Sequence, residues 1–214
     1  MHATQSRPSV RLSAATARYG RGEPVFADVD LTLDAPGLYQ VRGPNGSGKS
    51  TLVEVLSGYL PPSSGKVLIN GIPADDGAAH ATRRICRAEP ALYPMMSVRD
   101  HLAFASRWAG ADTAQAVNRA HRYGMGPWLD TPAEALSTGN RRRLWIIQCT
   151  VGQFDVLVMD EPFNGLDDDS RTVLIQELTA WARHCCTVVV AHQPPEGLAF
   201  DEIIPWEPAV APLR

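Results

Sequence analysis

The sequence has 214 residues, of which 44% are hydrophobic and 20% charged, and its formal net charge is −3. That charge creates no general positive field, so we expect no nucleic-acid partner. No stretch approaches the roughly 18 uninterrupted apolar residues of a membrane helix, so we expect no direct membrane insertion. Residues 1–8 carry no apolar run, which argues against a signal peptide. A chain of this length is most simply one domain, here 1–214.

The first 40 residues alternate apolar and polar side chains, for example over 10–12 and 29–33. This period of two predicts antiparallel strands. A short apolar strand over 38–41 leads into a glycine-rich loop and a helix over 50–57. Beyond a proline-rich break at 61–65, another strand and turn are predicted over 66–71.

Residues 97–126 are rich in helix formers, and Ser97 is placed to cap a helix over 98–108. A second helix is expected over 113–123. The later elements return to a mixed pattern: helix 141–151, strand 155–159, helix 170–184 and a strand ending at Ala191. This order predicts an α/β fold with a mainly parallel sheet, an N-terminal antiparallel β subdomain and a helical subdomain inserted at about 94–143.

A glycine-rich segment matches the phosphate-binding pattern G-x-x-x-x-G-K-[ST]. The segment consists of Gly43, Pro44, Asn45, Gly46, Ser47, Gly48, Lys49, Ser50 and Thr51. Its glycines let several backbone N–H groups converge on one anion, and the following helix directs its positive end at the same point. Lys49 can reach the terminal phosphates and Ser50 can bind Mg²⁺. The segment therefore predicts a nucleoside triphosphate site, with Mg²⁺ as cofactor.

Two acids, Asp160 and Glu161, follow the apolar strand at 156–159. Ligands bind beyond the carboxyl ends of such strands, so Asp160 is expected to hold Mg²⁺ with Ser50. Glu161 is expected to orient and deprotonate the attacking water. His192 ends the next apolar strand at the same edge and is a further catalytic candidate, close to the terminal phosphate.

Other charged and thiol groups have simpler interpretations. Arg141, Arg142 and Arg143 form the one basic cluster, which we interpret as a solvated helix face. The cysteines have no metal-ligand spacing, and Cys185 and Cys186 are expected to be small core residues in a reducing compartment.

Shortly before the Asp-Glu strand stands the segment Leu136-Ser137-Thr138-Gly139-Asn140, which is similar to the signature L-S-G-G-Q. With this segment the sequence resembles the nucleotide-binding subunits of ATP-binding cassette (ABC) transporters, whose signature it is. In the family, this signature closes over the ATP of a second cassette. The resemblance therefore implies an ATPase that works as a homodimer or heterodimer with shared sites.

Further positions match the family pattern. Asp167 matches an aspartate that crosses the dimer interface, His192 matches the switch histidine, and Tyr19 matches the aromatic residue that stacks on adenine. Two positions depart from it: Ala88 stands where the family has a glutamine that contacts Mg²⁺ and water, and Thr138 replaces a glycine. The sequence also ends soon after the His192 strand, so we expect it to lack the C-terminal domain of many importers.

The resemblance implies a cytoplasmic subunit, peripheral on the inner face of the membrane, that drives separate transmembrane permease subunits. Its short length and signature favour an exporter. We expect the permease to dock on residues 89–96 and the helical block after Ser97. The alternatives are a soluble ABC ATPase outside transport and a partly degenerate cassette in a heterodimer.

Overall fold

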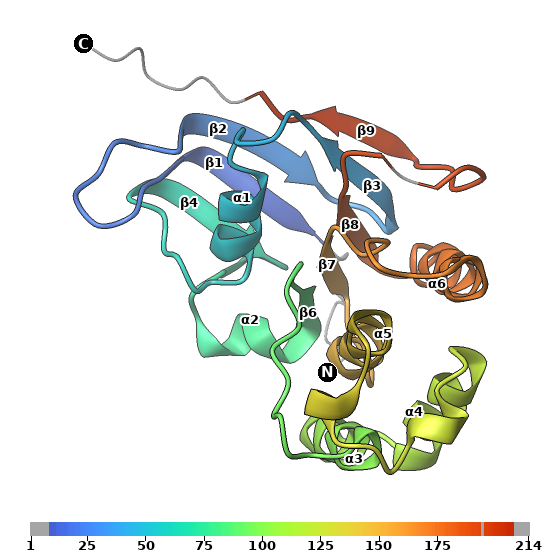
Figure 1. Ribbon diagram of the computed structural model, residues 1–214. Coiled ribbons are helices and arrows are strands. Elements are labelled where there is room, and N and C mark those ends of the chain that lie inside the picture. The colour runs from blue at the N-terminus through green and yellow to red at the C-terminus, as the bar shows by residue number, and fades with distance from the viewer. Residues whose placement is uncertain (1–8, 194, 208–214) are drawn as a thin grey trace, which may run out of the picture.

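The computed structural model describes residues 9–193 and 195–207, and its elements form two sheets with helices packed on them (Figure 1). Residues 1–8, on which the signal-peptide expectation rests, lie outside the described residues. The observed architecture is the α/β arrangement predicted above, with an antiparallel β subdomain, a parallel core sheet and a helical insertion.

The first sheet is antiparallel, in the strand order β2-β1-β4-β5. Its strands are β1 (Val10–Ala17), β2 (Phe26–Leu33), β4 (Ser64–Ile69) and β5 (Ile72–Pro73). The alternating pattern buries Val10 and Leu12 while Arg11 between them is exposed, as a half-buried strand requires.

The second sheet is parallel, in the order β6-β7-β8-β3-β9. Its strands are β3 (Gly37–Arg42), β6 (Arg83–Cys86), β7 (Val156–Asp160), β8 (Cys186–Val190) and β9 (Glu202–Pro205). Every residue of β7 and β8 is buried, because helices and the other sheet cover both faces. Cys185 and Cys186 are buried as expected.

The helices fall into two groups. The first group packs on the sheets and consists of α1 (Lys49–Leu56), α2 (Gly77–Thr82) and α6 (Asp168–Trp181). Of these, α1 lies in the core between both sheets. The second group, α3 (Val98–Ala109), α4 (Thr113–Arg122) and α5 (Thr138–Cys149), packs together, with α3 and α4 at the end of the molecule farthest from β1 and β2 (Figure 1).

Helix ends follow their capping residues. Ser97 caps α3 in a reciprocal capping box with Asp100, so this helix begins where it was predicted. The predicted start of the helix over 141–151 was wrong. Ser137 accepts a hydrogen bond from the Asn140 amide (3.2 Å), and this cap starts α5 at Thr138.

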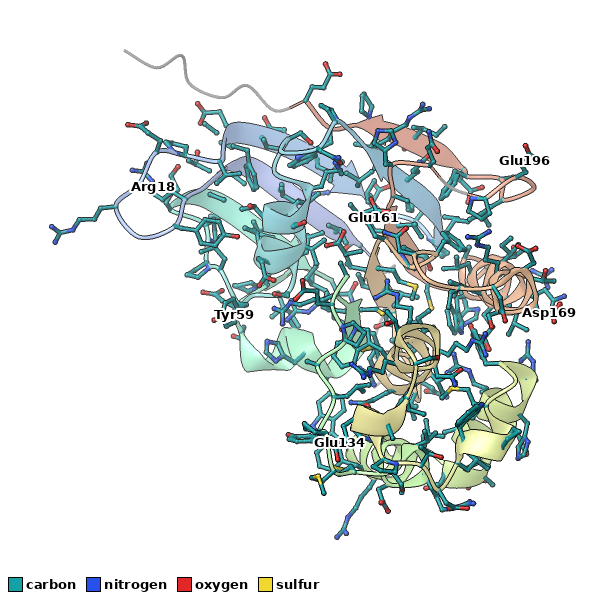
Figure 2. The ribbon with its side chains drawn as sticks, viewed as in Figure 1. Arg18, Tyr59, Glu134, Glu161, Asp169 and Glu196 are labelled. Carbon is teal, nitrogen blue, oxygen red and sulfur yellow. The ribbon has the colours of Figure 1, made fainter. Side chains whose placement is uncertain are left out.

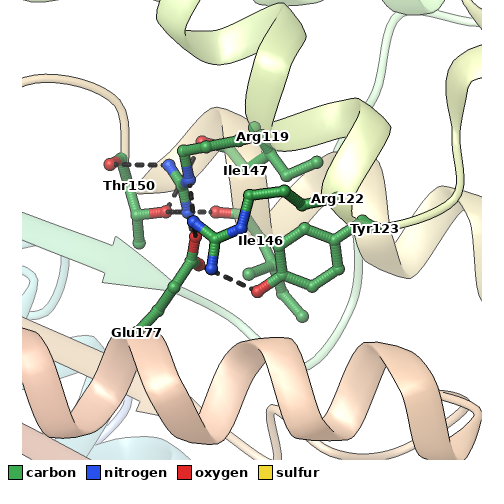
Figure 3. A network of polar contacts seen from close by, with 7 residues as sticks. All are labelled: Arg119, Arg122, Tyr123, Ile146, Ile147, Thr150 and Glu177. Carbon is green, nitrogen blue, oxygen red and sulfur yellow. Dashed lines mark hydrogen bonds and ion pairs between the residues drawn. The ribbon is translucent and has the colours of Figure 1, made fainter.

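A buried polar network joins α4 to α6 (Figure 3). Arg119 donates to both carboxylate oxygens of Glu177, at 3.0 and 2.8 Å, and the Tyr123 hydroxyl donates to the same carboxylate at 2.9 Å. Arg119 also donates to the carbonyl of Thr150, just beyond α5, at 3.1 Å. The network therefore fixes the helical block against a helix of the core.

Candidate functional site

The phosphate-binding pattern forms the connection between β3 and α1, so it lies at the carboxyl end of a central parallel strand. Gly46 (φ 80°) and Gly48 (φ 89°) adopt left-handed backbone conformations, which residues with a side chain rarely adopt. Gly48 is the N-cap of α1 and supplies no side-chain cap. The first amides of α1 are therefore free of a capping side chain and directed to the loop, as an anion site requires.

The loop is held from behind by Trp206, a residue that the sequence did not single out. The buried Trp206 indole donates its Nε1–H to the Ser47 carbonyl (3.0 Å), and its ring packs edge-on against Phe26. Gly43 passes so close that a Cβ would lie 2.2 Å from the Trp206 carbonyl oxygen. The segment after β9 thus fixes the loop's shape, and no local pattern around Trp206 indicated this contact.

Lys49 folds back over the loop. Its Nζ donates to the carbonyls of Gly43 (2.8 Å) and Pro44 (2.7 Å), and its side chain is largely buried. The ammonium group is therefore held at the mouth of the loop, where a phosphate oxygen can accept a hydrogen bond from it.

One pocket of about 360 Å³ brings most of the predicted loop residues and both acids together, while Gly43, Pro44 and Ser47 do not line it. It is lined by Val25, Asn45, Gly46, Gly48, Lys49, Ser50, Thr51, Asp160 and Glu161. Burial raises the pKa of the Asp160 carboxyl and the adjacent Glu161 charge raises it further, while a hydrogen bond from Ser50 lowers it. Figure 2 shows Glu161 close to the middle of the view, near the end of β7.

Glu161 has a left-handed backbone (φ 44°), which is uncommon outside glycine and stores strain of about 1 kcal/mol or more. Its amide donates to the Val190 carbonyl (2.8 Å), and its carboxylate accepts from the His192 amide (3.2 Å). His192 therefore lies beside the acid, as predicted. Its exposed side chain, however, lines a separate hollow with Arg42, Gly43 and Pro44 rather than the pocket above.

Tyr19 lies beside the phosphate loop. Its ring is half exposed, and its hydroxyl is 3.4 Å from the Thr51 Oγ1. An exposed aromatic ring at the start of α1 is open to stacking by a planar base.

Among the residues that the structure describes, those of the signature do not line the pocket. Ser137 caps α5, Thr138 begins it, and Asn140 accepts a hydrogen bond from Arg143 (3.2 Å). Arg143 also forms an ion pair with Asp167. The signature and the Asp167 loop are therefore linked into one surface.

The interpretation of the basic cluster as a solvated face was wrong for Arg142. This side chain is buried, and its guanidinium donates to backbone carbonyls at the end of β7 and beyond β6. Neighbouring Arg141 is exposed, as predicted. No sequence pattern distinguishes the two residues, because only the packing of α5 decides which arginine points inward.

Ala88 and Glu89 follow β6 and are both exposed. The Ala88 methyl group offers no donor or acceptor, but its carbonyl accepts from Arg142 at 2.7 Å. The only polar contacts available at this position come from the backbone.

Comparison with known proteins decides the family. A profile described as "ABC transporter" matches residues 26–164, from β2 through the phosphate loop and signature to the residues after Glu161. The chain belongs to the ABC transporter ATP-binding cassette family. As a member, it is an ABC ATPase, which hydrolyses ATP to drive transport.

Relatives of this cassette have names that assign them different directions of transport. It is 34% identical to the cytochrome c biogenesis ATP-binding export protein CcmA 2 of Cupriavidus metallidurans, over 83% of this chain and 87% of that protein. It is 31% identical to the taurine import ATP-binding protein TauB of Pseudomonas fluorescens, over 91% and 76%. It is 32% identical to the mycobactin import ATP-binding/permease protein IrtB of Mycolicibacterium smegmatis, over 89% of this chain but only 35% of that protein.

Solved structures support the fold of the cassette. A putative ABC transporter ATP-binding protein from Pyrococcus furiosus aligns with a TM-score of 0.78 at 20% identity, covering 92% of this chain and 97% of that one. A bacterial Atm1-family ABC exporter with ATP bound aligns with a TM-score of 0.79 at 22% identity, covering 89% of this chain and 36% of that one.

Within residues 9–193 and 195–207, no helix is both long and apolar enough to cross a bilayer.

Proposed function

We propose that this cassette is a separate ATP-hydrolysing subunit that pairs with a second cassette on binding ATP and drives transmembrane permease subunits. The observation that carries the proposal is the separation of two half-sites on one chain. The phosphate loop and both acids line one pocket, whereas Ser137, Gly139 and Asp167 lie on a surface outside it. A head-to-tail partner, either a copy of this chain or a related cassette, would bring its signature to the open side of the pocket.

Within each pocket the residues divide the chemistry. Lys49 and the amides at the start of α1 bind the phosphates, and Tyr19 stacks on the base. The Ser50 hydroxyl and the Asp160 carboxylate are oxygen ligands of the kind that Mg²⁺ prefers, and the ion would neutralise phosphate charge. Glu161 orients the attacking water and accepts its proton, and His192, whose amide contacts that carboxylate, would contribute its imidazole once the site closes.

A groove of about 650 Å³ between the core and the helical block supports a permease docking site. Exposed aromatic side chains line it, among them Tyr59, Phe104 and Trp108, and Trp145 contributes to its wall. Arg84 lies over the Trp108 ring and Arg87 over the Tyr59 ring, so the aromatic surface is edged by positive charge. A short apolar helix with acidic residues would fit this groove.

The docking groove partly coincides with the surface predicted from the sequence. Tyr93 and Met95, from the predicted segment, are exposed, and the Tyr93 ring packs edge-on against Phe104 at the groove. The cassette would thus sit on the cytoplasmic face of the membrane through its partner. Charged substitutions at Trp108 and Tyr93 should uncouple transport while ATP binding is retained, and unchanged transport would place the partner elsewhere.

Export is the direction that we propose, because the match to a protein named as an export subunit covers 87% of that protein. Similarity to taurine import proteins makes import the competing outcome. Transport measured in vesicles of defined orientation, with the cassette and its permease reconstituted together, distinguishes the two directions.

The shared-site proposal is tested with Glu161→Gln and ATP. This variant should bind ATP, lose nearly all hydrolysis and form a dimer that light scattering detects, while the parent protein without ATP stays a monomer. Lys49→Ala is the control that should lose ATP binding and dimerisation together. Gly139→Asp places a carboxylate against the phosphate of the partner's site, so full ATPase activity in that variant would contradict the proposal.

A further inference from the structure

Arg142 of α5 joins two loops that flank the pocket. Its Nη2 donates to the carbonyls of Asp160 (2.9 Å) and Glu161 (2.8 Å). Its Nη1 donates to the carbonyls of Arg87 (2.8 Å) and Ala88 (2.7 Å). The planar guanidinium therefore connects the end of β7 to the segment after β6, and it is only 3% exposed.

The acceptors of this buried cation are backbone carbonyls. Among the residues that the structure describes, Arg142 forms no ion pair with a carboxylate. The hydrogen bonds of its guanidinium go to carbonyl oxygens, so each short contact matters for keeping the charge buried. The guanidinium and the two loops must consequently hold one another in place.

The carbonyls at the end of β7 belong to a turn with a special backbone. Glu161 has φ 44°, and its amide is fixed by the Val190 carbonyl at 2.8 Å while its carbonyl is fixed by Arg142. Because the backbone conformation sets the direction of the side chain, these two contacts, together with the hydrogen bond from the His192 amide to the carboxylate (3.2 Å), set where the Glu161 carboxylate points.

The contacts of Arg142 with the segment after β6 include the carbonyl of Ala88, a residue without a polar side chain. Trp145, one helical turn after Arg142, donates its indole N–H to the Arg87 carbonyl at 3.0 Å. Two side chains of α5 thus hold the backbone of this segment. Of these two, Arg142 also donates to the turn at Glu161 and so connects the segment to it.

We infer that Arg142 is a positioning residue for ATP hydrolysis, which fixes the backbone of the Asp160–Glu161 turn and ties it to the backbone of residues 87–88. The inference rests on the proposed role of Glu161 as the base. Arg142 touches no reacting atom; it acts by keeping the carboxylate in one direction.

The test compares steady-state hydrolysis by Arg142→Gln with that of the parent protein. We expect kcat to fall about 10- to 100-fold while KM for ATP changes by less than about threefold, because the phosphate loop is untouched. Arg142→Lys keeps the charge but cannot span four carbonyls, so its kcat should also stay well below the parent value. Full activity in the lysine variant would overturn the inference.

Arg83→Gln is the matched control. Arg83 is also a buried arginine that donates to carbonyls, those of Leu56, Ser57 and Ala74, but none of these belongs to the Asp160–Glu161 turn. The Arg83→Gln variant should lose about as much thermal stability as Arg142→Gln, but it should keep the parent kcat at temperatures where it is folded. Parallel losses of stability and kcat in both variants would reduce Arg142 to a structural residue and overturn the inference.

A double variant shows whether Arg142 acts through Glu161. Adding Arg142→Gln to Glu161→Gln should lower the residual hydrolysis no further, whereas an additional 10-fold loss or more would overturn the inference. If Glu161→Gln itself hydrolyses ATP at the parent rate, the proposed base is wrong. If Glu161→Gln is inactive but Arg142→Gln has the parent kcat, only the present inference fails.

Discussion

Arg119 on α4 and Glu177 on α6 form a two-pronged ion pair, with Nε–Oε1 and Nη2–Oε2 distances of 3.0 and 2.8 Å. The carboxylate is 7% exposed and also accepts from Tyr123. The helical block is therefore fixed to the core by a directional contact as well as by apolar packing. Such a contact has one correct geometry, so it sets the orientation of α4 relative to α6.

Breaking this pair should destabilise the fold. Arg119→Ala leaves the Glu177 carboxylate buried with only Tyr123 and the longer contact to Arg122 at 3.5 Å. We expect the free energy of unfolding in urea to fall by about 3 kcal/mol. The control is Arg171→Ala, whose partner Asp168 is almost fully exposed and which should change it by less than about 0.5 kcal/mol. Equal losses in both variants would show that burial adds nothing to the pair.

The indole of Trp206 should affect nucleotide binding. Trp206→Phe retains a ring against Phe26 but leaves the Ser47 carbonyl without its donor. We expect a loss of about 1 kcal/mol in the free energy of unfolding, together with a several-fold rise in KM for ATP and little change in kcat. Trp128→Phe, at a half-exposed tryptophan outside the pocket, serves as the control. An unchanged KM would mean that the loop keeps its shape without this hydrogen bond.

A glutamine at position 88, where the resemblance to the family predicts one, should alter hydrolysis more than binding. Ala88 and Glu89 are both exposed, and Ala88 supplies only its carbonyl, to Arg142. We expect Ala88→Gln to change the rate of hydrolysis, or its stimulation by the permease, while the affinity for ATP stays within about twofold. The comparison variant is Glu89→Ala. If that change is crippling and Ala88→Gln is silent, Glu89 has taken over the role of the glutamine.

Two cysteines should resist alkylation in the folded protein. Burial raises the pKa of the Cys185 and Cys186 thiols from 9.0 to about 12, and the Cys185 thiol donates to the Phe154 carbonyl at 2.9 Å. At about pH 8 the thiolate fraction of each residue is therefore roughly a thousandfold lower in the folded protein than in the unfolded chain. Iodoacetamide should modify the two residues only after unfolding, which peptide mass spectrometry would show. Labelling of the folded protein at the rate of the unfolded chain would contradict this prediction.

The same raised pKa values make stability depend on pH. Between about pH 9 and 12 the unfolded chain releases the two thiol protons while the folded chain retains them, so unfolding is favoured as pH rises. The urea midpoint should therefore fall above about pH 9, and it should fall less steeply in Cys186→Ala. An equal slope in that variant would assign the effect to other groups.

The sequence by itself determined the features that depend on neighbouring residues. The spacing of Gly43, Gly48 and Lys49 fixes a phosphate loop wherever it follows a strand. Ser97 caps its helix through a residue three positions later, and alternation decides which side chains of β1 are buried. The place of the two acids beside Ser50 also followed from the sequence, because parallel strands present their carboxyl ends at one edge.

Only the tertiary structure decided the contacts between segments that are distant in the chain. Trp206 meets Ser47 across 159 positions and Arg119 meets Glu177 across 58, so no local pattern contains either pair. Arg142 differs from Arg141 only in the direction that α5 gives it, and burial follows from that direction. Such contacts depend on how whole helices and strands pack, which is a property of the complete core rather than of any short segment.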